Sequence, residues 1–422
     1  MRLLIIGNLV IPEFCDVYSI KIRPYGGWIS GMISELKKDD SFILGCCFPI
    51  IDEDRMKNGI SNGIAYYSFR AEMDTADYNR NSDYGYIDEF IRVYEDFEPD
   101  IVYVMGTEYA HARIAAEAAN YYKKAKVVIH IQGLVTYYEK HYMLGIPADL
   151  QKQALRNGIS IFDEANDLKK RGKNERWVIE NADYIFGRTE WDEICCKEVN
   201  SHAHYYHVGE ILRSEFYDLP IFWSIDKIKR HQIFLSQASY PIKGLHLLLP
   251  AIYALKKEYP DINIRIGGRD VTSNSENAAY SAYICNLIRK YELLENVQFL
   301  GELGPKEMIR EYLEAHIFVS PSTIENSANS IGEAMMVGCP VIASYVGGTP
   351  SLIEHRKSGI LYQCDASYML AGYIREIFQQ DSFASNLSRN AVEVARKRYG
   401  RKKLINEMKN TFLKILEAQK EK

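Results

Sequence analysis

The chain has 422 residues, which is too many for a single hydrophobic core, so we expect two domains of about 200 residues each. Its hydrophobic content of 47% and charged content of 25% are typical of a soluble globular protein, and no apolar run reaches the roughly 18–20 residues of a membrane span. The net charge of −5 gives a nucleic-acid partner no electrostatic support.

The cellular compartment is predicted from the amino terminus and from the cysteines. The apolar start, residues 1–14, lacks a small-residue cleavage site and is typical of a buried strand rather than of a signal peptide. The chain has eight cysteines and no CxxC motif, which favours free thiols in a reducing compartment. We therefore predict a cytoplasmic protein, with the inner face of the membrane as a further location.

The first half of the chain alternates apolar strands with helices. Strands are predicted at Arg2–Val10, Phe42–Phe48, Pro99–Val104 and Lys126–Ile131, and helices at Trp28–Lys38, Tyr84–Phe97 and Glu108–Tyr122. Near-continuous apolar strands are typical of a parallel sheet that is buried on both faces. The alternation therefore predicts a doubly wound α/β domain.

Three further segments of this half carry polar residues. Asp52-Glu53-Asp54 matches a metal-binding DxD pattern, but a solvated acidic turn is the favoured interpretation. Residues 136–180 are rich in Tyr, Lys and Glu and predict helices and a mobile loop, with acceptor binding and a solvated surface both open. His202, His204 and His207 have metal-ligating side chains, but they lie in an alternating, tyrosine-rich strand, which favours a structural role.

The second half, after a linker predicted near 218–229, repeats the same alternation. Strand Gln232–Gln237 precedes Lys243-Gly244 and a helix at 245–258, and strand Ile262–Ile266 precedes Gly267-Gly268-Arg269. A flexible lysine beside a glycine at a helix start suits phosphate binding. Helices predicted at 383–398 and 402–418 close the chain, and the last one has an apolar stripe that faces a core.

Residues 316–348 predict a strand, a loop, a helix and a second strand. Glu325 precedes the helix and Glu333 lies about one turn inside it, so both can face the carboxyl edge of a parallel sheet, where such sheets bind ligands. The N–H groups near Asn329 and Ser330 form a phosphate site, and carboxylates accept hydrogen bonds from vicinal hydroxyls. A nucleotide sugar offers ribose, diphosphate and hexose to such a site. Two glutamates beside an ordinary surface helix are the alternative.

The same residues resemble the donor-site signature of the family-4 (group 1) retaining glycosyltransferases of the GT-B fold, with a fainter likeness to the bacterial polysaccharide type. The matching residues are Glu325, Glu333-Ala334-Met335, Gly338, Pro340-Val341-Ile342-Ala343 and Gly347-Gly348. The resemblance covers the second half well and the first half mainly in the order of its elements. It implies two Rossmann-like, doubly wound parallel-sheet domains that face across a cleft. Residues 1–218 would form the acceptor domain and 219–401 the donor domain, and a helix at about 402–420 would pack back on the first.

The resemblance implies transfer of a hexose from a nucleoside diphosphate sugar to an acceptor hydroxyl with retained configuration and without a metal or other cofactor. Lys243 would stabilise the departing diphosphate and Glu325 would hold the sugar, which makes them the expected catalytic residues. Glu333 would hold the ribose. The implied donor-binding residues are Gly27, Gln237, Gly244, Arg269, Leu300, Gly301, Asn326, Ser327, Ala328, Asn329, Ser330 and Glu333. The implied acceptor-side residues are His130, Gln132 and Gly133.

Several of these positions leave alternatives open. The family usually has an arginine where this chain has Gln237, so one phosphate-neutralising cation is missing, and Arg269 is a candidate replacement. The family's His-Gly pair is Gln132-Gly133 here, and Gln132 is favoured over His130 because a histidine inside a strand is more often a core residue. For Gly27 a plain tight turn is equally open. Residues 208–213 replace the family's usual Pro-Asn-Gly-Val-Asp segment.

The acceptor is expected to be a saccharide or lipid-linked saccharide in cell-surface polysaccharide synthesis. Residues 121–124 (Tyr-Tyr-Lys-Lys) are a weak indication of peripheral membrane contact, against the favoured alternative of a solvated helix end. Two other functions remain open. A nucleotide-sugar epimerase or hydrolase can share this fold, and a catalytically silent nucleotide-sugar-binding partner is supported by Gln237.

Overall fold

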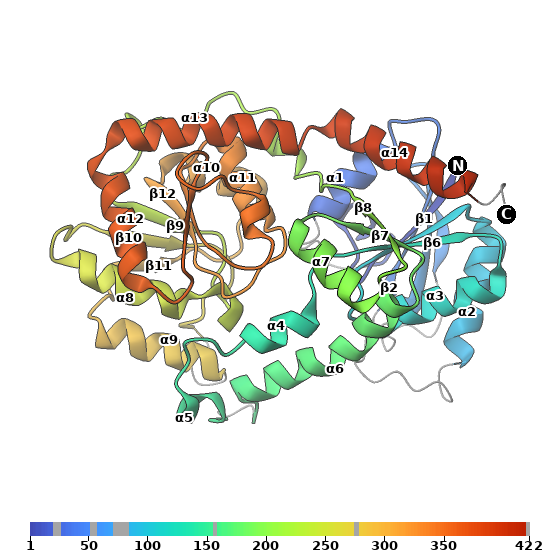
Figure 1. The fold of residues 1–422 in the computed structure, drawn as a ribbon, viewed down its shortest axis with the longest axis horizontal. Coiled ribbons are helices and arrows are strands. Elements are labelled where there is room, and N and C mark those ends of the chain that lie inside the picture. The colour runs from blue at the N-terminus through green and yellow to red at the C-terminus, as the bar shows by residue number, and fades with distance from the viewer. Residues whose placement is uncertain (20–26, 51–56, 71–83, 155–157, 274–277, 419–422) are drawn as a thin grey trace. The chain divides into compact units, whose positions relative to one another are not determined.

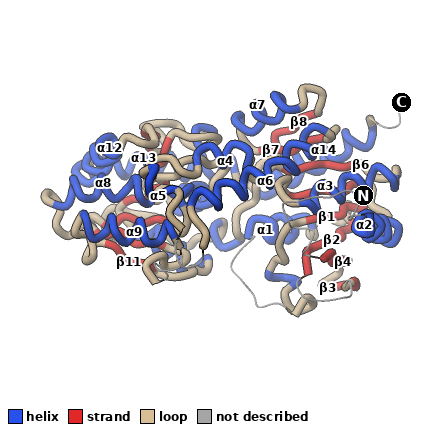
Figure 2. Tube along the Cα trace, turned by 90° about the horizontal axis from the view of Figure 1, so that it is seen from below, coloured by secondary structure: helices blue, strands red, loops and turns tan. Residues whose placement is uncertain are grey.

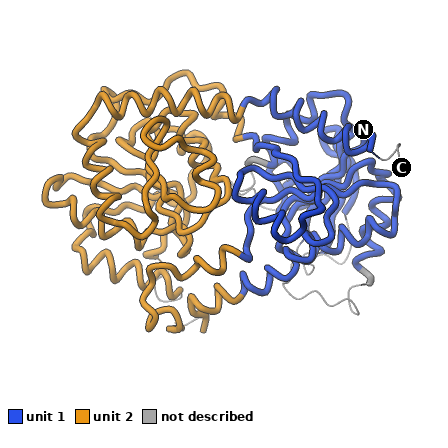
Figure 3. The backbone as a smooth tube through the Cα atoms, in the orientation of Figure 1, with its two compact units in different colours: residues 1–136, 167–211, 400–422 blue, residues 137–166, 212–399 orange. Residues whose placement is uncertain are grey.

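The computed structural model describes residues 1–19, 27–50, 57–70, 84–154, 158–273 and 278–418 (Figure 1). The chain folds into two compact units, each of which consists of more than one segment of the sequence (Figure 3). Unit 1 consists of residues 1–136, 167–211 and 400–422, and unit 2 of residues 137–166 and 212–399. In both units strands are flanked by helices, as Figure 2 shows.

Unit 1 is built on a sheet whose described strands follow the order β3-β4-β2-β1-β5-β6-β7-β8. Their bounds are β1 (Arg2–Ile6), β2 (Ile43–Ile50), β3 (Asn58–Ser61), β4 (Ile64–Arg70), β5 (Ile101–Met105), β6 (Lys126–His130), β7 (Tyr184–Gly187) and β8 (His204–His207). Strand β3 pairs antiparallel with β4 at one edge, and the other pairs are parallel. Strands β1 and β5 are almost fully buried, because helices cover both faces of the sheet.

The β3–β4 hairpin was missing from the predicted elements, because residues 56–82 are mostly polar. Its connection is Asn62-Gly63, and both residues have positive φ angles of 50° and 76°. An Asn-Gly pair between two strands is a strong hairpin pattern, since these residues adopt the left-handed conformations that a two-residue turn requires. This local pattern could have predicted the hairpin. The acidic turn at 52–54 lies outside the described residues.

The helices of unit 1 include the C-terminal one. Their bounds are α1 (Gly27–Leu36), α2 (Tyr84–Phe97), α3 (Ala110–Tyr122), α7 (Glu190–Val199) and α14 (Arg401–Glu417), together with the start of α4 (Val135–His141) and most of α6 (Ile161–Glu180). In α14 the ring of Phe412 packs 5.4 Å from that of Tyr103 and 5.1 Å from that of Phe186. The apolar stripe of α14 therefore covers the centre of the sheet of unit 1.

Unit 2 contains a second parallel sheet, whose described strands follow the order β11-β10-β9-β12-β13-β14. The strands are β9 (Gln232–Leu235), β10 (Asn263–Ile266), β11 (Val297–Phe299), β12 (Ile317–Ser320), β13 (Val341–Ser344) and β14 (Ile360–Tyr362). The helices are α5 (Ala148–Gln151), α8 (Leu245–Lys256), α9 (Ala279–Lys290), α10 (Pro305–Glu314), α11 (Asn329–Val337), α12 (Ser367–Gln379) and α13 (Asp381–Arg398). Two doubly wound parallel-sheet units confirm the predicted fold class, and the cleft between them stays a prediction.

Residues 137–166 belong to unit 2, although they precede most of it in the sequence. Nε2 of His246 in α8 donates a hydrogen bond of 2.8 Å to the carbonyl oxygen of Leu144. Gly145 follows with a φ of +76°, and a Cβ atom there would lie 2.6 Å from Leu247. The division therefore differs from the predicted one, which assigned all of residues 1–218 to the first domain, because this segment makes its contacts with unit 2.

In unit 1, the start of α4 is held by a buried carboxylate on α6. The two oxygens of Glu175 accept hydrogen bonds from the N–H groups of Val135 at 2.7 Å and Thr136 at 2.9 Å. Burial raises the pKa of Glu175 to about 7, although the hydrogen bonds from Thr136 and Val135 oppose this shift. Glu175 therefore titrates near neutral pH while it caps the helix.

We expect this titration to make wild-type stability fall between pH 4.5 and 7. The native state holds the Glu175 proton up to about pH 7, whereas the unfolded chain releases it near 4.5, so the native state binds more protons in this interval. The free energy of unfolding of wild type relative to Glu175→Gln should therefore drop by about 3 kcal/mol from pH 4.5 to 8. Urea unfolding of both proteins across this range measures the difference, and a difference independent of pH would contradict the shifted pKa.

Candidate functional site

The winding of unit 2 reverses between β9 and β12, which are neighbours in its sheet. From β9 the chain proceeds outward through β10 and β11, and it then returns to β12 and proceeds through β13 and β14 on the other side. Loops diverge at such a switch point, and open α/β sheets bind ligands outside the carboxyl ends of the two strands. The loop after β9 carries Lys243, and the loop after β12 carries Glu325.

These two loops meet at Gly244, which has a φ of +69°. A Cβ atom at this position would lie 1.8 Å from the carbonyl oxygen of Pro321, so only glycine permits the close approach. Gly244 was predicted as a donor-binding residue on the family pattern. Its packing shows a structural reason for glycine as well, because it brings the Lys243 loop against the loop after β12.

Lys243 and Glu325 form an ion pair in which Nζ lies 2.5 Å from Oε1. The side chains are 20% and 11% exposed, and the hydroxyl of Ser322 donates to the same carboxylate oxygen at 3.0 Å. Burial disfavours the charged form of Lys243, but the Glu325 carboxylate outweighs this effect and raises the pKa of Lys243 above its usual range. The site therefore holds a permanent ammonium group beside a hydrogen-bonded carboxylate.

The loop after Glu325 leads directly into helix α11. Asn326 and Ser327 are buried, whereas Ala328, Asn329 and Ser330 are half-buried. Helix α11 begins at Asn329, so its first N–H groups and the positive end of its dipole lie in the same loop as Glu325. This geometry suits an anion. The N–H group of Asn326 donates to the hydroxyl oxygen of Tyr138 at 3.2 Å.

Glu333 is paired with an arginine that the predicted site residues do not include. Nε and one terminal nitrogen of Arg213 donate to its two oxygens, both at 2.8 Å, and the two side chains are 17% and 6% exposed. Burial raises the pKa of Glu333, and Arg213 opposes the shift. A carboxylate oxygen has two lone pairs, so an oxygen that accepts one hydrogen bond from Arg213 can accept a second from another donor. The unusual segment 208–213 was the only sequence pattern that pointed toward Arg213.

The remaining donor-binding candidates of unit 2 gather at the carboxyl ends of β9, β10 and β11. The amide of Gln237 donates to the hydroxyl of Ser239 at 3.1 Å, and Gly268 packs against the Gln237 side chain. The N–H group of Gly268 donates to the carbonyl of Gly301 at 2.8 Å, which joins the loops after β10 and β11. Arg269 is exposed beside Gly268, and Leu300 precedes Gly301 and is half-buried.

The other predicted site residues, Gly27, His130, Gln132 and Gly133, belong to unit 1. Gly27 is the first residue of α1. His130 is 1% exposed, its Nδ1 hydrogen-bonds to the Tyr103 hydroxyl, and burial lowers its pKa well below the usual range. His130 is therefore a core residue, in line with the preference for Gln132. Gln132 and Gly133 follow β6 and are half-buried, and the Gln132 carbonyl accepts a hydrogen bond from Arg188.

Arg188 is a second arginine that sequence patterns missed. It follows β7, is 4% exposed and lies 3.8 Å from a carboxylate oxygen of the buried Glu210. Of the histidine cluster, His204 stacks on Tyr184, and Nε2 of His207 hydrogen-bonds to the Arg188 carbonyl at 2.8 Å. Within the described ranges, no group of three or more His, Cys, Asp or Glu side chains has a geometry that could hold a metal.

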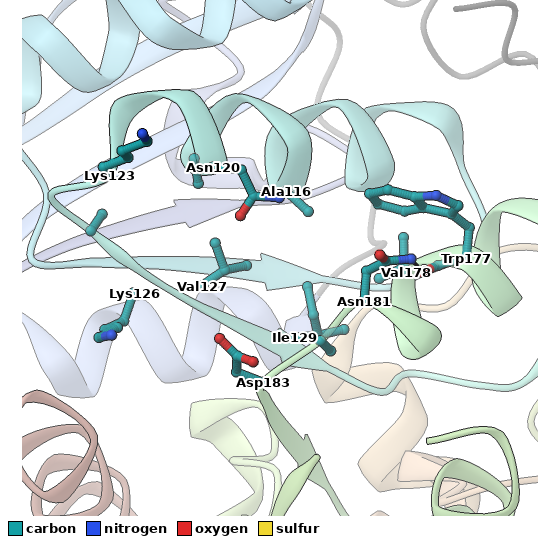
Figure 4. A pocket seen from close by; sticks show the side chains of 13 residues that line it. Ala116, Asn120, Lys123, Lys126, Val127, Ile129, Trp177, Val178, Asn181 and Asp183 are labelled. Carbon is teal, nitrogen blue, oxygen red and sulfur yellow. Dashed lines mark hydrogen bonds between the residues drawn. The ribbon is translucent and has the colours of Figure 1, made fainter. Parts of the chain in front are cut away.

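A hollow of about 230 Å³ in unit 1 lies apart from all these residues (Figure 4). It is lined by residues of α3, β6 and the end of α6, among them Asn120, Ile129 and Trp177, and by Asp183 after α6. It contains the amino end of β6, whereas the predicted residues Gln132 and Gly133 follow the carboxyl end. The hollow therefore belongs to no predicted site.

None of the described helices has the length and the apolar character that a membrane-spanning helix requires.

Comparisons with known proteins identify similar sequences for the second half of the chain. Residues 221–398 match the family model described as "Glycosyl transferases group 1". The chain is 29% identical over 159 residues to D-inositol 3-phosphate glycosyltransferase of Corynebacterium glutamicum, which covers 37% of each chain. It is 24% identical over 188 residues to spore coat protein SA of Bacillus subtilis, covering 44% of this chain and 49% of the relative. The sequence matches thus span less than half the length of these relatives.

Solved structures resemble the chain over nearly its whole length. Sucrose-phosphate synthase from Thermosynechococcus elongatus aligns with a TM-score of 0.73 at 15% identity, covering 99% of this chain and 100% of the other. Anabaena HepE in complex with UDP aligns with a TM-score of 0.67 at 14% identity, covering 98% and 100%. At these identities the likeness shows a shared fold.

Proposed function

We propose that this chain, which is a group 1 glycosyltransferase of the GT-B fold, moves a hexose from a nucleoside diphosphate sugar to a hydroxyl of a saccharide or lipid-linked saccharide with retained configuration. Cell-surface polysaccharide synthesis is the proposed role. The observation that carries the proposal is the Lys243–Glu325 pair at the switch point of unit 2. An ammonium beside a carboxylate suits a substrate with a diphosphate next to a sugar.

In the proposed reaction, the bond between the anomeric carbon and the diphosphate breaks while a bond to the acceptor oxygen forms. Negative charge develops on the leaving diphosphate, and the Lys243 ammonium and the N–H groups at the start of α11 stabilise it. Glu325 accepts hydrogen bonds from sugar hydroxyls and keeps Lys243 charged. The leaving phosphate takes the acceptor proton, so the reaction needs neither a dedicated base nor a metal.

Gln237 supplies no charge to the diphosphate, whereas the family has an arginine here. We propose that Arg269 provides the missing cation. It follows Gly268, which packs against Gln237, and its exposed side chain is long enough to swing toward a ligand. Membrane contact through 121–124 stays a prediction. Tyr121 is 52% exposed there, and both lysines are exposed.

A panel of nucleoside diphosphate sugars tests the proposal, scored by thermal shift and by slow release of free nucleoside diphosphate from the full-length chain. We expect one donor to stabilise the protein and to be hydrolysed slowly without an acceptor, and faster with a suitable saccharide. Tight binding without turnover, even with acceptors present, would favour a silent nucleotide-sugar-binding partner. Turnover that no acceptor accelerates would favour an epimerase or hydrolase, and no binding at all would refute the donor site.

A further inference from the structure

A tyrosine from the segment 137–166 contacts the loop that the donor site is built on. Tyr138 lies on α4, 188 residues before Asn326, whose N–H group donates to the Tyr138 hydroxyl oxygen at 3.2 Å. Asn326 directly follows Glu325 and is 1% exposed. A buried N–H group needs a hydrogen-bond partner within the protein. The Tyr138 hydroxyl satisfies this N–H group, so it is part of the loop's structure.

The segment that carries Tyr138 is anchored on unit 2 at several points. Nε2 of His246 donates to the Leu144 carbonyl at 2.8 Å, as described above. The hydroxyl of Tyr142 donates to Glu164 at 2.9 Å, which joins the turn after α4 to the start of α6. These contacts fix the turn that follows α4. The turn that follows Tyr138 is therefore held independently of the hydrogen bond between Tyr138 and Asn326.

Tyr138 also lies close to the ammonium of the candidate site. Its partner Asn326 directly follows Glu325, whose Oε1 lies 2.5 Å from Nζ of Lys243. The Tyr138 hydroxyl thus lies beside the loop that holds this ion pair. Lys243 is the proposed partner of the leaving diphosphate, and Asn326 is one of the expected donor-binding residues.

We propose that Tyr138 weakens binding of the transferred sugar, because its hydroxyl competes with a hydroxyl of that sugar for the N–H group of Asn326. The inference rests on the proposed function. One N–H group has one hydrogen and makes one well-aligned hydrogen bond at a time. A nucleotide sugar therefore has to displace the Tyr138 hydroxyl, whereas a free nucleoside diphosphate has no sugar that reaches Asn326. Tyr138 lowers the affinity for the sugar part of the donor alone.

Tyr138→Phe tests this competition, because it removes the hydroxyl and keeps the ring. We expect the dissociation constant for the donor identified in the panel to fall roughly threefold to tenfold, the range of one hydrogen bond. The dissociation constant for the corresponding nucleoside diphosphate should stay unchanged. Isothermal titration calorimetry of the full-length chain with each ligand measures both. Tyr142→Phe is the matched control, since it removes a hydroxyl of the same segment that bonds to Glu164.

Each outcome separates the competition from simpler explanations. An unchanged or weaker donor affinity in Tyr138→Phe would overturn the proposal. Equal changes for donor and nucleoside diphosphate, or the same changes in Tyr142→Phe, would assign the effect to the packing of the segment and would overturn it too. If wild type bound nucleoside diphosphate but no nucleotide sugar of the panel, the proposed function would fail first, and the inference would fall with it.

Discussion

Replacing Lys243 by alanine should lower the turnover of the donor sugar by about 100-fold to 1000-fold, the usual effect of removing one group that stabilises transition-state charge. The ammonium is proposed to neutralise the leaving diphosphate, and alanine leaves that charge without its main protein partner. The loss should appear in kcat for release of nucleoside diphosphate, measured with saturating donor. Because Glu325 raises the pKa of Lys243, wild-type turnover should show no loss from lysine deprotonation up to about pH 10.

Lys357→Ala is the control for this experiment. Lys357 is 71% exposed, and its ion-pair partner Glu354 lies three residues earlier in the same surface turn of unit 2. Exposed ion pairs of this kind contribute little to the free energy of unfolding, so we expect the turnover and the stability of Lys357→Ala to be close to those of wild type. Retention of turnover within threefold in Lys243→Ala would refute the role of the lysine. A change in the unfolding transition of Lys243→Ala would assign part of the effect to the unpaired Glu325.

Replacing Arg213 by methionine should destabilise the protein by about 3 kcal/mol at neutral pH, because it leaves the buried Glu333 carboxylate without its bidentate partner. Methionine keeps much of the arginine volume, so the lost charge dominates the effect. The pKa of Glu333 is already raised by burial, and removing Arg213 raises it further. The native variant then binds a proton that the unfolded chain releases near pH 4.3, so its stability falls as pH rises above that value.

Urea unfolding of wild type and of Arg213→Met between pH 4 and 8 measures this difference, which should shrink on acidification. The double variant Arg213→Met/Glu333→Gln removes the buried charge as well and should recover most of the lost stability. Equal stability of Arg213→Met and wild type at pH 7 would show that solvent or another group compensates Glu333. Donor affinity of the same variants reports separately on whether Glu333 holds the ribose.

Much of the fold could be predicted from local patterns. The C-terminal helix was expected at 402–418 and is found at Arg401–Glu417, and the helix expected at 383–398 is found at Asp381–Arg398. Strands were less well bounded, since β1 ends at Ile6 and not at Val10. Leu9 and Val10 continue the apolar pattern, but the pairing of β1 with β2 and β5 stops at Ile6. A repeating apolar pattern predicts that a strand exists, whereas its pairing with adjacent strands determines the residue at which the strand ends.

The sequence by itself predicted the donor region, because Glu325, Glu333 and the glycines around α11 lie within one short stretch of the chain with the spacing of the family pattern. Only the tertiary structure decided what these groups contact. Arg213 meets Glu333 across 120 residues of chain, and Tyr138 meets Asn326 across 188. Contacts between residues so far apart in the chain depend on how whole helices and strands pack. The spacing of residues within one short stretch cannot predict that packing. For the same reason, the sequence did not predict that residues 137–166 belong to unit 2. His246 donates to the backbone carbonyl of Leu144, and because every residue type has such a carbonyl, the sequence gives no signal for this contact.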